Sequence, residues 1–230
     1  AFDAAHRHAD QAVRKENQAF YEYMVPIVKG WSTEMAIDVA STGVQIHGGM
    51  GFIEETGAAQ YYRDARILTI YEGTTAVQAN DLIGRKTVRD GGATANRILS
   101  QVRKTEADLT VSASEDLRAI AKQLALGANA LEEVVGYVLA NAKSDIKAVF
   151  AGSVLYLKLA GVVLGGWQMA RAALIAEQKL KACEGDARFY AAKIATARFF
   201  AEHILVRASA YRTAIIDGSV GVLALDEDQF

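Results

Sequence analysis

The near absence of proline is the feature that most limits how this chain can fold. Proline occurs once in 230 residues, at Pro26. Proline breaks helix interiors, and here long stretches rich in Ala, Leu, Lys, Glu and Arg favour helix instead. Because 51% of the residues are hydrophobic, the chain can also build a sizeable core. The sequence therefore predicts an all-α fold of one or two domains.

The first part of the chain predicts two helices. Residues 1–22 form a polar helix, and Pro26 suits the first turn of a second helix that Gly48 and Gly49 end. We expect no metal at His6 and His8, because residues two apart point to different faces of a helix. The second helix carries an apolar stripe formed by Val28, Met35, Val39 and Ile46.

Three further elements precede a predicted domain boundary. A short helix capped by Thr56 should be followed by a brief extended connection over residues 67–71, and then by a helix over residues 74–86. The polar, glycine-containing stretch at residues 89–92 resembles a linker. We therefore predict one domain over residues 1–90 and another over residues 91–230.

The sequence of the second domain predicts four helical segments, over residues 93–109, 114–141, 145–181 and 186–216. Their starts carry capping signals at Ser112 with Glu115, at Ser144-Asp145 and at Gly185-Asp186. Apolar residues in the last segment recur at steps of four and three, as in an antiparallel helix bundle. These residues are Tyr190, Ile194, Ala197, Ala201, Ile204, Ala208, Tyr211 and Ile215.

A membrane helix is an alternative interpretation of residues 148–170. The segment is long and nearly apolar, and Gly161 and Gly165 have the spacing of a membrane helix contact. However, Lys158 falls near its middle, the neighbouring helices are amphipathic, and the same glycine spacing also allows close packing in soluble bundles. We therefore expect a soluble bundle and no membrane partner.

Residues 41–86 are the one stretch whose residue choices suggest chemistry. The sequence QIHGGMG at residues 45–51 ends a helix with glycines, which allow positive φ and close approach of backbone N–H groups to another molecule. Glu72 directly precedes a predicted helix whose Thr75 and Gln78 have capping-box spacing. Taken alone, such a Glu is more often a partner of the helix dipole than a catalyst. Arg63-Asp64 suggests structural salt bridges.

Three motifs in this stretch together resemble one family. QIHGGMGF, YYRDARI and IYEGT, in this order and spacing, closely resemble the C-terminal domain of the FAD-dependent acyl-CoA dehydrogenases. The resemblance is clear over residues 25–92. The remainder more weakly resembles the helical extension of a branch of longer members. The resemblance thus implies the family's C-terminal helical bundle followed by a second helical bundle.

The resemblance implies oxidation of an acyl-CoA to the trans-2-enoyl-CoA. Glu72 would remove the α-proton while the β-hydride passes to FAD. A Glu in water is too weak a base for a thioester, so the substrate must also be acidified. In the family, the backbone N–H of this Glu and a flavin hydroxyl bind the thioester carbonyl. Tyr71 and Gly73 would contact the substrate, with Gly73 leaving room for the acyl chain.

The resemblance also assigns cofactor contacts and partners. Thr74 and Thr75 would contact the FAD beside Glu72, whereas Ala76 stands where several members have Gln or Glu. The FAD of a neighbouring subunit would be contacted by Gln45, Ile46, His47, Gly48 and Gly49. This implies a homodimer or homo-oligomer, with electron-transferring flavoprotein as the acceptor. Because the family's N-terminal and middle domains are not in the sequence, we expect this chain alone to be inactive.

Two alternatives to the dehydrogenase stay open, and composition excludes other classes. An acyl-CoA oxidase would use the same base but pass electrons to oxygen, and a non-catalytic helical interaction module would bind no flavin. The net charge of −2, with 25 basic residues spread along the chain, indicates no nucleic-acid partner. Cys183 is the only cysteine, so no internal disulfide is possible and we expect a cytoplasmic protein. No signal peptide is recognisable at Ala1.

Overall fold

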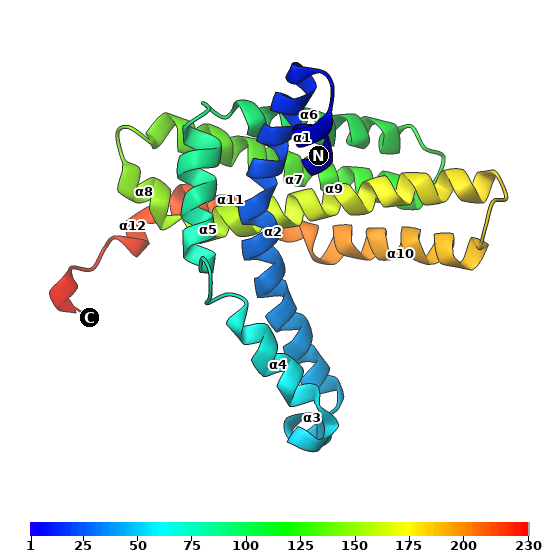
Figure 1. Cartoon of the computed structure of the whole chain (residues 1–230), viewed down its shortest axis with the longest axis horizontal. Coiled ribbons are helices and arrows are strands. Elements are labelled where there is room, and N and C mark those ends of the chain that lie inside the picture. The colour runs from blue at the N-terminus through cyan, green and yellow to red at the C-terminus, as the bar shows by residue number, and fades with distance from the viewer. Residues whose placement is uncertain (230) are drawn as a thin grey trace. The chain divides into compact units, whose positions relative to one another are not determined.

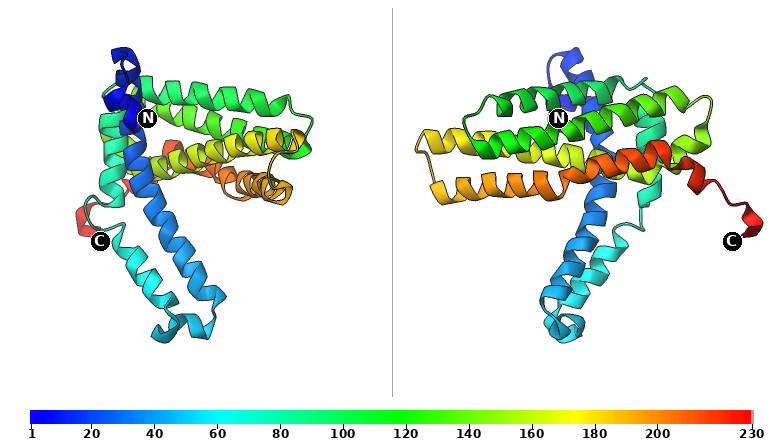
Figure 2. Two further views of the ribbon diagram at one scale, coloured as in Figure 1. Left: turned by 45° about the vertical axis from the view of Figure 1, so that its right-hand side comes forward. Right: turned by 180° about the vertical axis from the view of Figure 1, so that it is seen from behind.

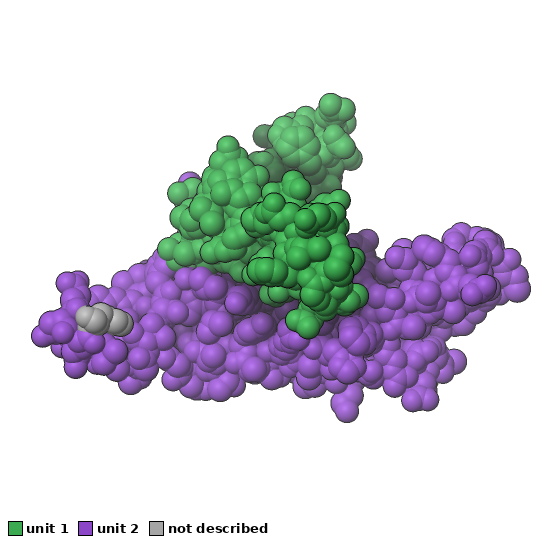
Figure 3. All heavy atoms as spheres, turned by 90° about the horizontal axis from the view of Figure 1, so that it is seen from below, with its two compact units in different colours: residues 1–86 green, residues 87–230 purple. Residues whose placement is uncertain are grey.

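The computed structural model describes residues 1–229, which are mostly helical and contain no β-strand. The all-α prediction is confirmed. The chain divides into two compact units, one from Ala1 to Lys86 (unit 1) and one from Thr87 onward (unit 2) (Figure 3).

Unit 1 is organised along one helix of 36 residues. Its helices are α1 (Phe2–Arg7), α2 (Gln11–Ile46), α3 (Gly49–Phe52), α4 (Ala58–Ile67) and α5 (Thr75–Ile83), with a 3₁₀ turn, η1 (Glu54–Thr56), before α4. The short π-helical stretch η2 (Gly84–Val88) follows α5. Both α4 and α5 pack along α2, and α3 lies at its C-terminal end (Figure 1).

The predicted helix start at Pro26 is wrong. Asp10 caps α2, its side chain accepting a hydrogen bond from the N–H of Ala12 at 2.7 Å, and the helix continues through a buried Pro26. Proline removes one N–H from the helical ladder, but its φ is helical, and packing of the neighbouring Tyr23 and Ile27 offsets that loss. The predicted polar helix over residues 1–22 is therefore α1 and the beginning of α2.

The predicted apolar stripe on α2 is not a core face. Its four residues are 41% to 78% exposed, whereas α2 buries Tyr23, Pro26, Ile27 and Gly30. Spacing identifies residues that share a face, but not the face on which α4 and α5 pack. The stripe consists of Val28, Met35, Val39 and Ile46.

Two predicted caps in the chain need correction. Thr56 ends η1 instead of capping α4: its hydroxyl donates to the carbonyl of Met50 at 2.7 Å, and Gly57 stands at the cap position. In unit 2 the cap of α7 is Ser114, which accepts from the N–H of Leu117. Ser112 instead donates to Glu177 at 2.6 Å. The second error arises because the neighbouring Ser112 and Ser114 have similar local signals.

Unit 2 is a bundle of long helices. It comprises α6 (Ala93–Thr110), α7 (Glu115–Asn141), α8 (Ile146–Ala151), α9 (Ser153–Lys181), α10 (Ala187–His203) and α11 (Ala208–Asp217). A 3₁₀ turn, η3 (Leu205–Arg207), joins α10 to α11, and the short α12 (Ser219–Val222) and η4 (Glu227–Gln229) follow. Figure 2 shows α9 and α10 side by side, and α9 also packs on α6, α7 and α11.

Burial in unit 2 follows the helical repeat. On α7 the residues Leu117, Leu124, Leu131 and Val138 recur every seven positions and are at most 2% exposed. The predicted seam of the last segment is confirmed, since five of its residues are buried and Tyr190, Ile204 and Tyr211 are half-buried. Two predicted segments are each divided, at Gly152 between α8 and α9, and at Ile204 between α10 and η3. Asp145 and Asp186 cap α8 and α10 as predicted.

Helix α9 is long and apolar enough to cross a membrane by length and composition alone. Within its most apolar 18-residue window, 61% of the residues are buried inside the protein. A core helix of a bundle has the same composition, because it is covered by apolar neighbours on most of its sides.

Candidate active site

Glu72 lies in a turn between α4 and α5. The chain turns immediately after α4, with the N–H groups of Ile70 and Tyr71 bonded to the carbonyl of Ile67 at 3.0 and 3.2 Å. The predicted extended connection over residues 67–71 is therefore wrong. The backbone N–H groups are bonded to a carbonyl three or four residues earlier, whereas an extended segment would bond to a neighbouring strand.

The backbone of Glu72 is in a left-handed conformation that non-glycine residues rarely adopt. Its φ is 47°, followed by 100° at Gly73. Such a conformation costs on the order of 1–3 kcal/mol and persists only where the surroundings impose it. Gly73 accepts its φ because it has no Cβ, and a Cβ there would lie 2.5 Å from Nε2 of Gln78. The side chain of Glu72 is exposed, so its carboxylate is accessible to another molecule.

The start of α5 is built by two adjacent threonines with different roles. Thr74 is the N-cap, its Oγ1 accepting from the N–H of Val77 at 3.4 Å. The hydroxyl of Thr75 donates to Oε1 of Glu34 on α2 at 2.5 Å. The predicted capping box from Thr75 to Gln78 is therefore wrong, because the cap lies one residue earlier. The cap leaves other N–H groups of the first turn of α5 for a ligand.

Two residues on α2 hold the turn, and sequence reasoning missed both. Besides Glu34, the ammonium of Lys29 donates to the carbonyl of Leu68 and, at 3.2 Å, to that of Tyr71. Lys29 also lies 5.3 Å from the centre of the Tyr71 ring. These contacts join residues 39 to 42 positions apart, and no local pattern indicates them.

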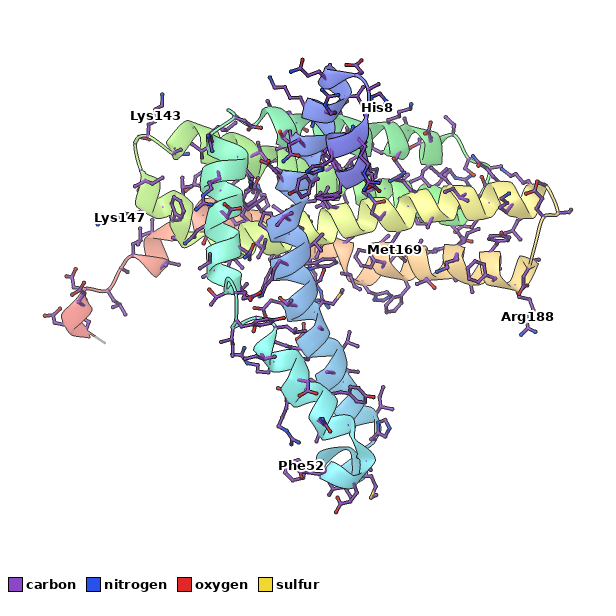
Figure 4. All side chains as sticks on the ribbon, in the orientation of Figure 1. His8, Phe52, Lys143, Lys147, Met169 and Arg188 are labelled. Carbon is purple, nitrogen blue, oxygen red and sulfur yellow. The ribbon has the colours of Figure 1, made fainter. Side chains whose placement is uncertain are left out.

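The predicted glycine turn lies at the far end of α2. His47 ends the helix, Gly48 has a φ of 60°, and nothing lies within 4 Å of a Cβ built on Gly48 or Gly49. Gly51 is buried, and a Cβ there would lie 2.2 Å from the carbonyl oxygen of Val44. Figure 4 labels the exposed Phe52 beside this turn. The five predicted contact residues Gln45, Ile46, His47, Gly48 and Gly49 are all exposed.

The predicted site residues form two groups in the structure. Tyr71, Gly73 and Thr74 lie with Glu72 in one short turn, and Thr75 directly follows as the first residue of α5. Thr75 contacts α2 at Glu34, eleven residues before Gln45, so at 1.5 Å per residue the groups are roughly 16 Å apart along the helix. Within one copy of the chain, the two groups therefore do not form a single compact site. Among residues 1–229, no group of three or more His, Cys, Asp or Glu side chains is arranged to hold a metal.

Exposed apolar residues precede and follow Glu72 along the chain. Ile67, Ile70, Tyr71 and Val77 are each between 46% and 55% exposed. A carboxylate among exposed apolar groups suits a substrate that places a hydrocarbon chain against the protein. The N–H groups of the first turn of α5, beside this carboxylate, add a place for acceptor atoms of a second molecule.

Comparisons with known proteins identify the family of this chain. The family model described as "Acyl-CoA dehydrogenase, C-terminal domain" matches residues 1–86, and the one described as "Acetyl-CoA dehydrogenase C-terminal like" matches residues 98–226. The chain belongs to the acyl-CoA dehydrogenase family, of which it spans the C-terminal domain and the C-terminal extension. The resemblance inferred from the motifs is thus confirmed.

Several curated proteins are similar over most of this chain. The 3-methylmercaptopropionyl-CoA dehydrogenase of Ruegeria pomeroyi is 52% identical over 91% of this chain and 35% of its own length. The broad-specificity linear acyl-CoA dehydrogenase FadE5 of Mycobacterium tuberculosis is 34% identical over the same shares. Subunit CarC of the caffeyl-CoA reductase-Etf complex of Acetobacterium woodii is 44% identical over 23% of this chain and 14% of its own length. The chain spans about a third of the length of the first two.

Proposed function

We propose that the protein containing this chain oxidises an acyl-CoA to the trans-2-enoyl-CoA, with Glu72 as the base that removes the α-proton. The observation that carries the proposal is the turn itself, which holds an exposed carboxylate in a left-handed backbone conformation beside exposed apolar side chains. In the reaction the α C–H electron pair forms the new double bond, the proton stays on the Glu72 carboxylate, and a hydride leaves the β-carbon. FAD, when bound, accepts that hydride.

The residues of this chain fit a flavin nucleotide at two places. At the start of α5, the Thr74 hydroxyl can donate outward, because only its oxygen is used by Val77. At the end of α2, Gly48 and Gly49 leave the backbone open to close approach. We propose that Thr74 and Thr75 contact the FAD beside Glu72, and that residues 45–49 contact the FAD of a second copy.

The backbone around Glu72 prepares the substrate for deprotonation. We propose that the Glu72 N–H donates to the thioester carbonyl, which stabilises the negative charge that develops there as the proton leaves. Gly73 leaves space beside that carbonyl, and Tyr71 lines the acyl side with its exposed ring. Together these groups acidify the α-carbon and orient it towards the carboxylate.

The proposed cofactor contacts make each flavin site incomplete within one copy of the chain. We propose a homodimer or larger homo-oligomer, because residues 45–49 would contact the FAD of a second copy. A cytoplasmic location, a functional division into residues 1–90 and 91–230, and electron transfer to electron-transferring flavoprotein are parts of the same proposal. The last is supported by the similarity to CarC, which belongs to a complex named for Etf.

The test is Glu72→Gln in the full-length enzyme. The change is nearly isosteric and removes only the basic oxygen, so flavin content and substrate binding should persist while turnover falls about 10²–10⁴-fold or more. Glu55→Gln is the matched control, since Glu55 is an exposed carboxylate of the same unit outside the turn. Turnover of the Glu72 variant near that of the control would refute the assignment.

A further inference from the structure

Lys29 of α2 makes three contacts with the segment that carries Glu72. Its ammonium donates to the carbonyl of Leu68 and to that of Tyr71 at 3.2 Å, and it lies 5.3 Å from the Tyr71 ring centre. Leu68 is the C-cap residue of α4, where helix carbonyls lack partners in their own helix. One charged side chain thus joins the end of α4 to the residue preceding Glu72.

The turn is held on its other side by Glu34. The Thr75 hydroxyl donates to Glu34 at 2.5 Å, so α2 contacts the chain both before and after Glu72. Between these two points, Glu72 and Gly73 have positive φ and no helical hydrogen-bond ladder of their own. The left-handed conformation of Glu72 therefore depends on contacts supplied by α2.

A lysine suits this role because of its donors and its charge. An ammonium has three donors and no acceptor, so it can bond two carbonyl groups at once. Hydrogen bonds from a charged donor are roughly twice as strong as neutral ones. Lys29 is half-buried, so water competes less for its hydrogen bonds to the two carbonyl groups. An apolar residue of similar length fills the same space but holds neither carbonyl.

We propose that Lys29 is a positioning residue for the Glu72 carboxylate, acting through the backbone of Leu68 and Tyr71. The inference rests on the proposed role of Glu72 as the base. Without Lys29, the turn samples other conformations and the carboxylate spends less time at the α-carbon. A misplacement of about 1 Å is enough to lower a rate by about 10²-fold.

A purely structural role for Lys29 predicts different results. If the lysine only stabilised the end of α4, its loss would lower the yield of folded, flavin-bound enzyme. The enzyme that did fold would turn over at the normal rate. The turnover number per bound flavin therefore distinguishes positioning from stabilisation, because it counts only enzyme that has folded around its cofactor.

The experiment compares Lys29→Met, Lys29→Arg and Lys15→Met in the full-length enzyme. Lys15 is an exposed lysine of the same helix and controls for the loss of a charge on α2. We expect Lys29→Met to lower kcat per bound flavin about 10²-fold with little change in KM. We expect Lys29→Arg to restore much of the rate, and Lys15→Met to behave as wild type. An unchanged kcat per bound flavin in Lys29→Met would overturn the proposal.

A double variant separates this inference from the proposed function. If Lys29 acts through Glu72, adding Lys29→Met to Glu72→Gln should lower the residual rate no further. Additive losses would overturn the positioning role. Normal turnover of Glu72→Gln alone would overturn the proposed function instead. Where Lys29→Met does not yield folded enzyme, Lys29→Leu, which also lacks a donor, is measured with the same readouts and is judged by the same outcomes.

Hydrogen exchange gives a readout that needs no activity. In the 230-residue chain, amides of residues 70–75 should exchange faster in Lys29→Met than in Lys15→Met, while amides in the middle of α7 stay the same. Equal exchange of residues 70–75 in the two variants would show that Lys29 does not hold the turn, and would overturn the proposal.

Discussion

Removing the side chain of Leu205 should destabilise unit 2 strongly. Leu205 is 1% exposed, and its methyl groups lie against two buried glycines. A Cβ on Gly127 of α7 would be 2.7 Å from Leu205 Cδ1, and a Cβ on Gly166 of α9 would be 2.8 Å from Cδ2. Leu205 thus fills a hollow between two helices that exists because neither glycine has a side chain.

The expected loss of stability for Leu205→Ala is about 4 kcal/mol. Buried Leu→Ala changes cost about 2–5 kcal/mol, depending on how far the surroundings collapse into the cavity. Gly127 and Gly166 beside Leu205 have no side chain that could move into the cavity, so we expect a cost in the upper half of the range of about 2–5 kcal/mol. Urea unfolding of the 230-residue chain, followed by far-UV circular dichroism, measures the difference. Val206→Ala, at a residue 48% exposed, is the control and should change stability by less than about 0.5 kcal/mol.

The same geometry predicts that Gly166→Ala has opposite effects in two backgrounds. In the wild type the new methyl group displaces Leu205, and overpacking costs about 1–3 kcal/mol against a gain in helix propensity of about 1 kcal/mol. In Leu205→Ala the methyl group enters the cavity, so the variant should recover about 1–2 kcal/mol. Equal effects in both backgrounds, or a cost below about 1.5 kcal/mol for Leu205→Ala, would refute the packing argument.

Three further predictions follow from other parts of the structure. Burial alone raises the pKa of the Glu177 carboxyl, but hydrogen bonds from Ser112 and Lys181 outweigh this and hold its pKa below the usual range. The resulting stability is present above the unfolded-state pKa of about 4.3 and is lost as pH falls through the lowered pKa, so Ser112→Ala should reduce this acid dependence in urea titrations. The purified 230-residue chain should show strong helical circular dichroism but neither flavin absorbance nor acyl-CoA oxidation, and stoichiometric FAD in it would contradict the incomplete-site proposal. The same chain should stay in solution when mixed with liposomes, and stable partition into them would favour a membrane helix at α9.

Much of the helical architecture could be predicted from local signals. The scarcity of proline predicts helices throughout the chain. The caps Asp145 and Asp186 each bond to N–H groups only two or three residues away, so they can be recognised in the sequence. Errors arose where one helix depends on another. Pro26 resembles a helix start, yet α2 continues through it because Tyr23 and Ile27 are buried on either side.

The candidate site shows the same limit. The motif residues 71–75 could be placed in one turn, because they are adjacent along the chain. Lys29 and Glu34 could not be found, since their partners are 39 to 42 residues away and depend on how α4 and α5 pack on α2. The exposed stripe on α2 could not be distinguished from a core face by its spacing alone.

Proton exchange at the substrate's α-carbon shows whether Glu72 is the base. An acyl-CoA analogue with sulfur in place of its β-carbon cannot lose a hydride, so only the proton-transfer step remains. Incubated in heavy water with the full-length enzyme, this analogue should gain deuterium at its α-carbon, as measured by mass spectrometry. We expect Glu72→Gln to abolish this exchange and Glu55→Gln to leave it unchanged. Exchange at the wild-type rate in Glu72→Gln would show that another group removes the proton.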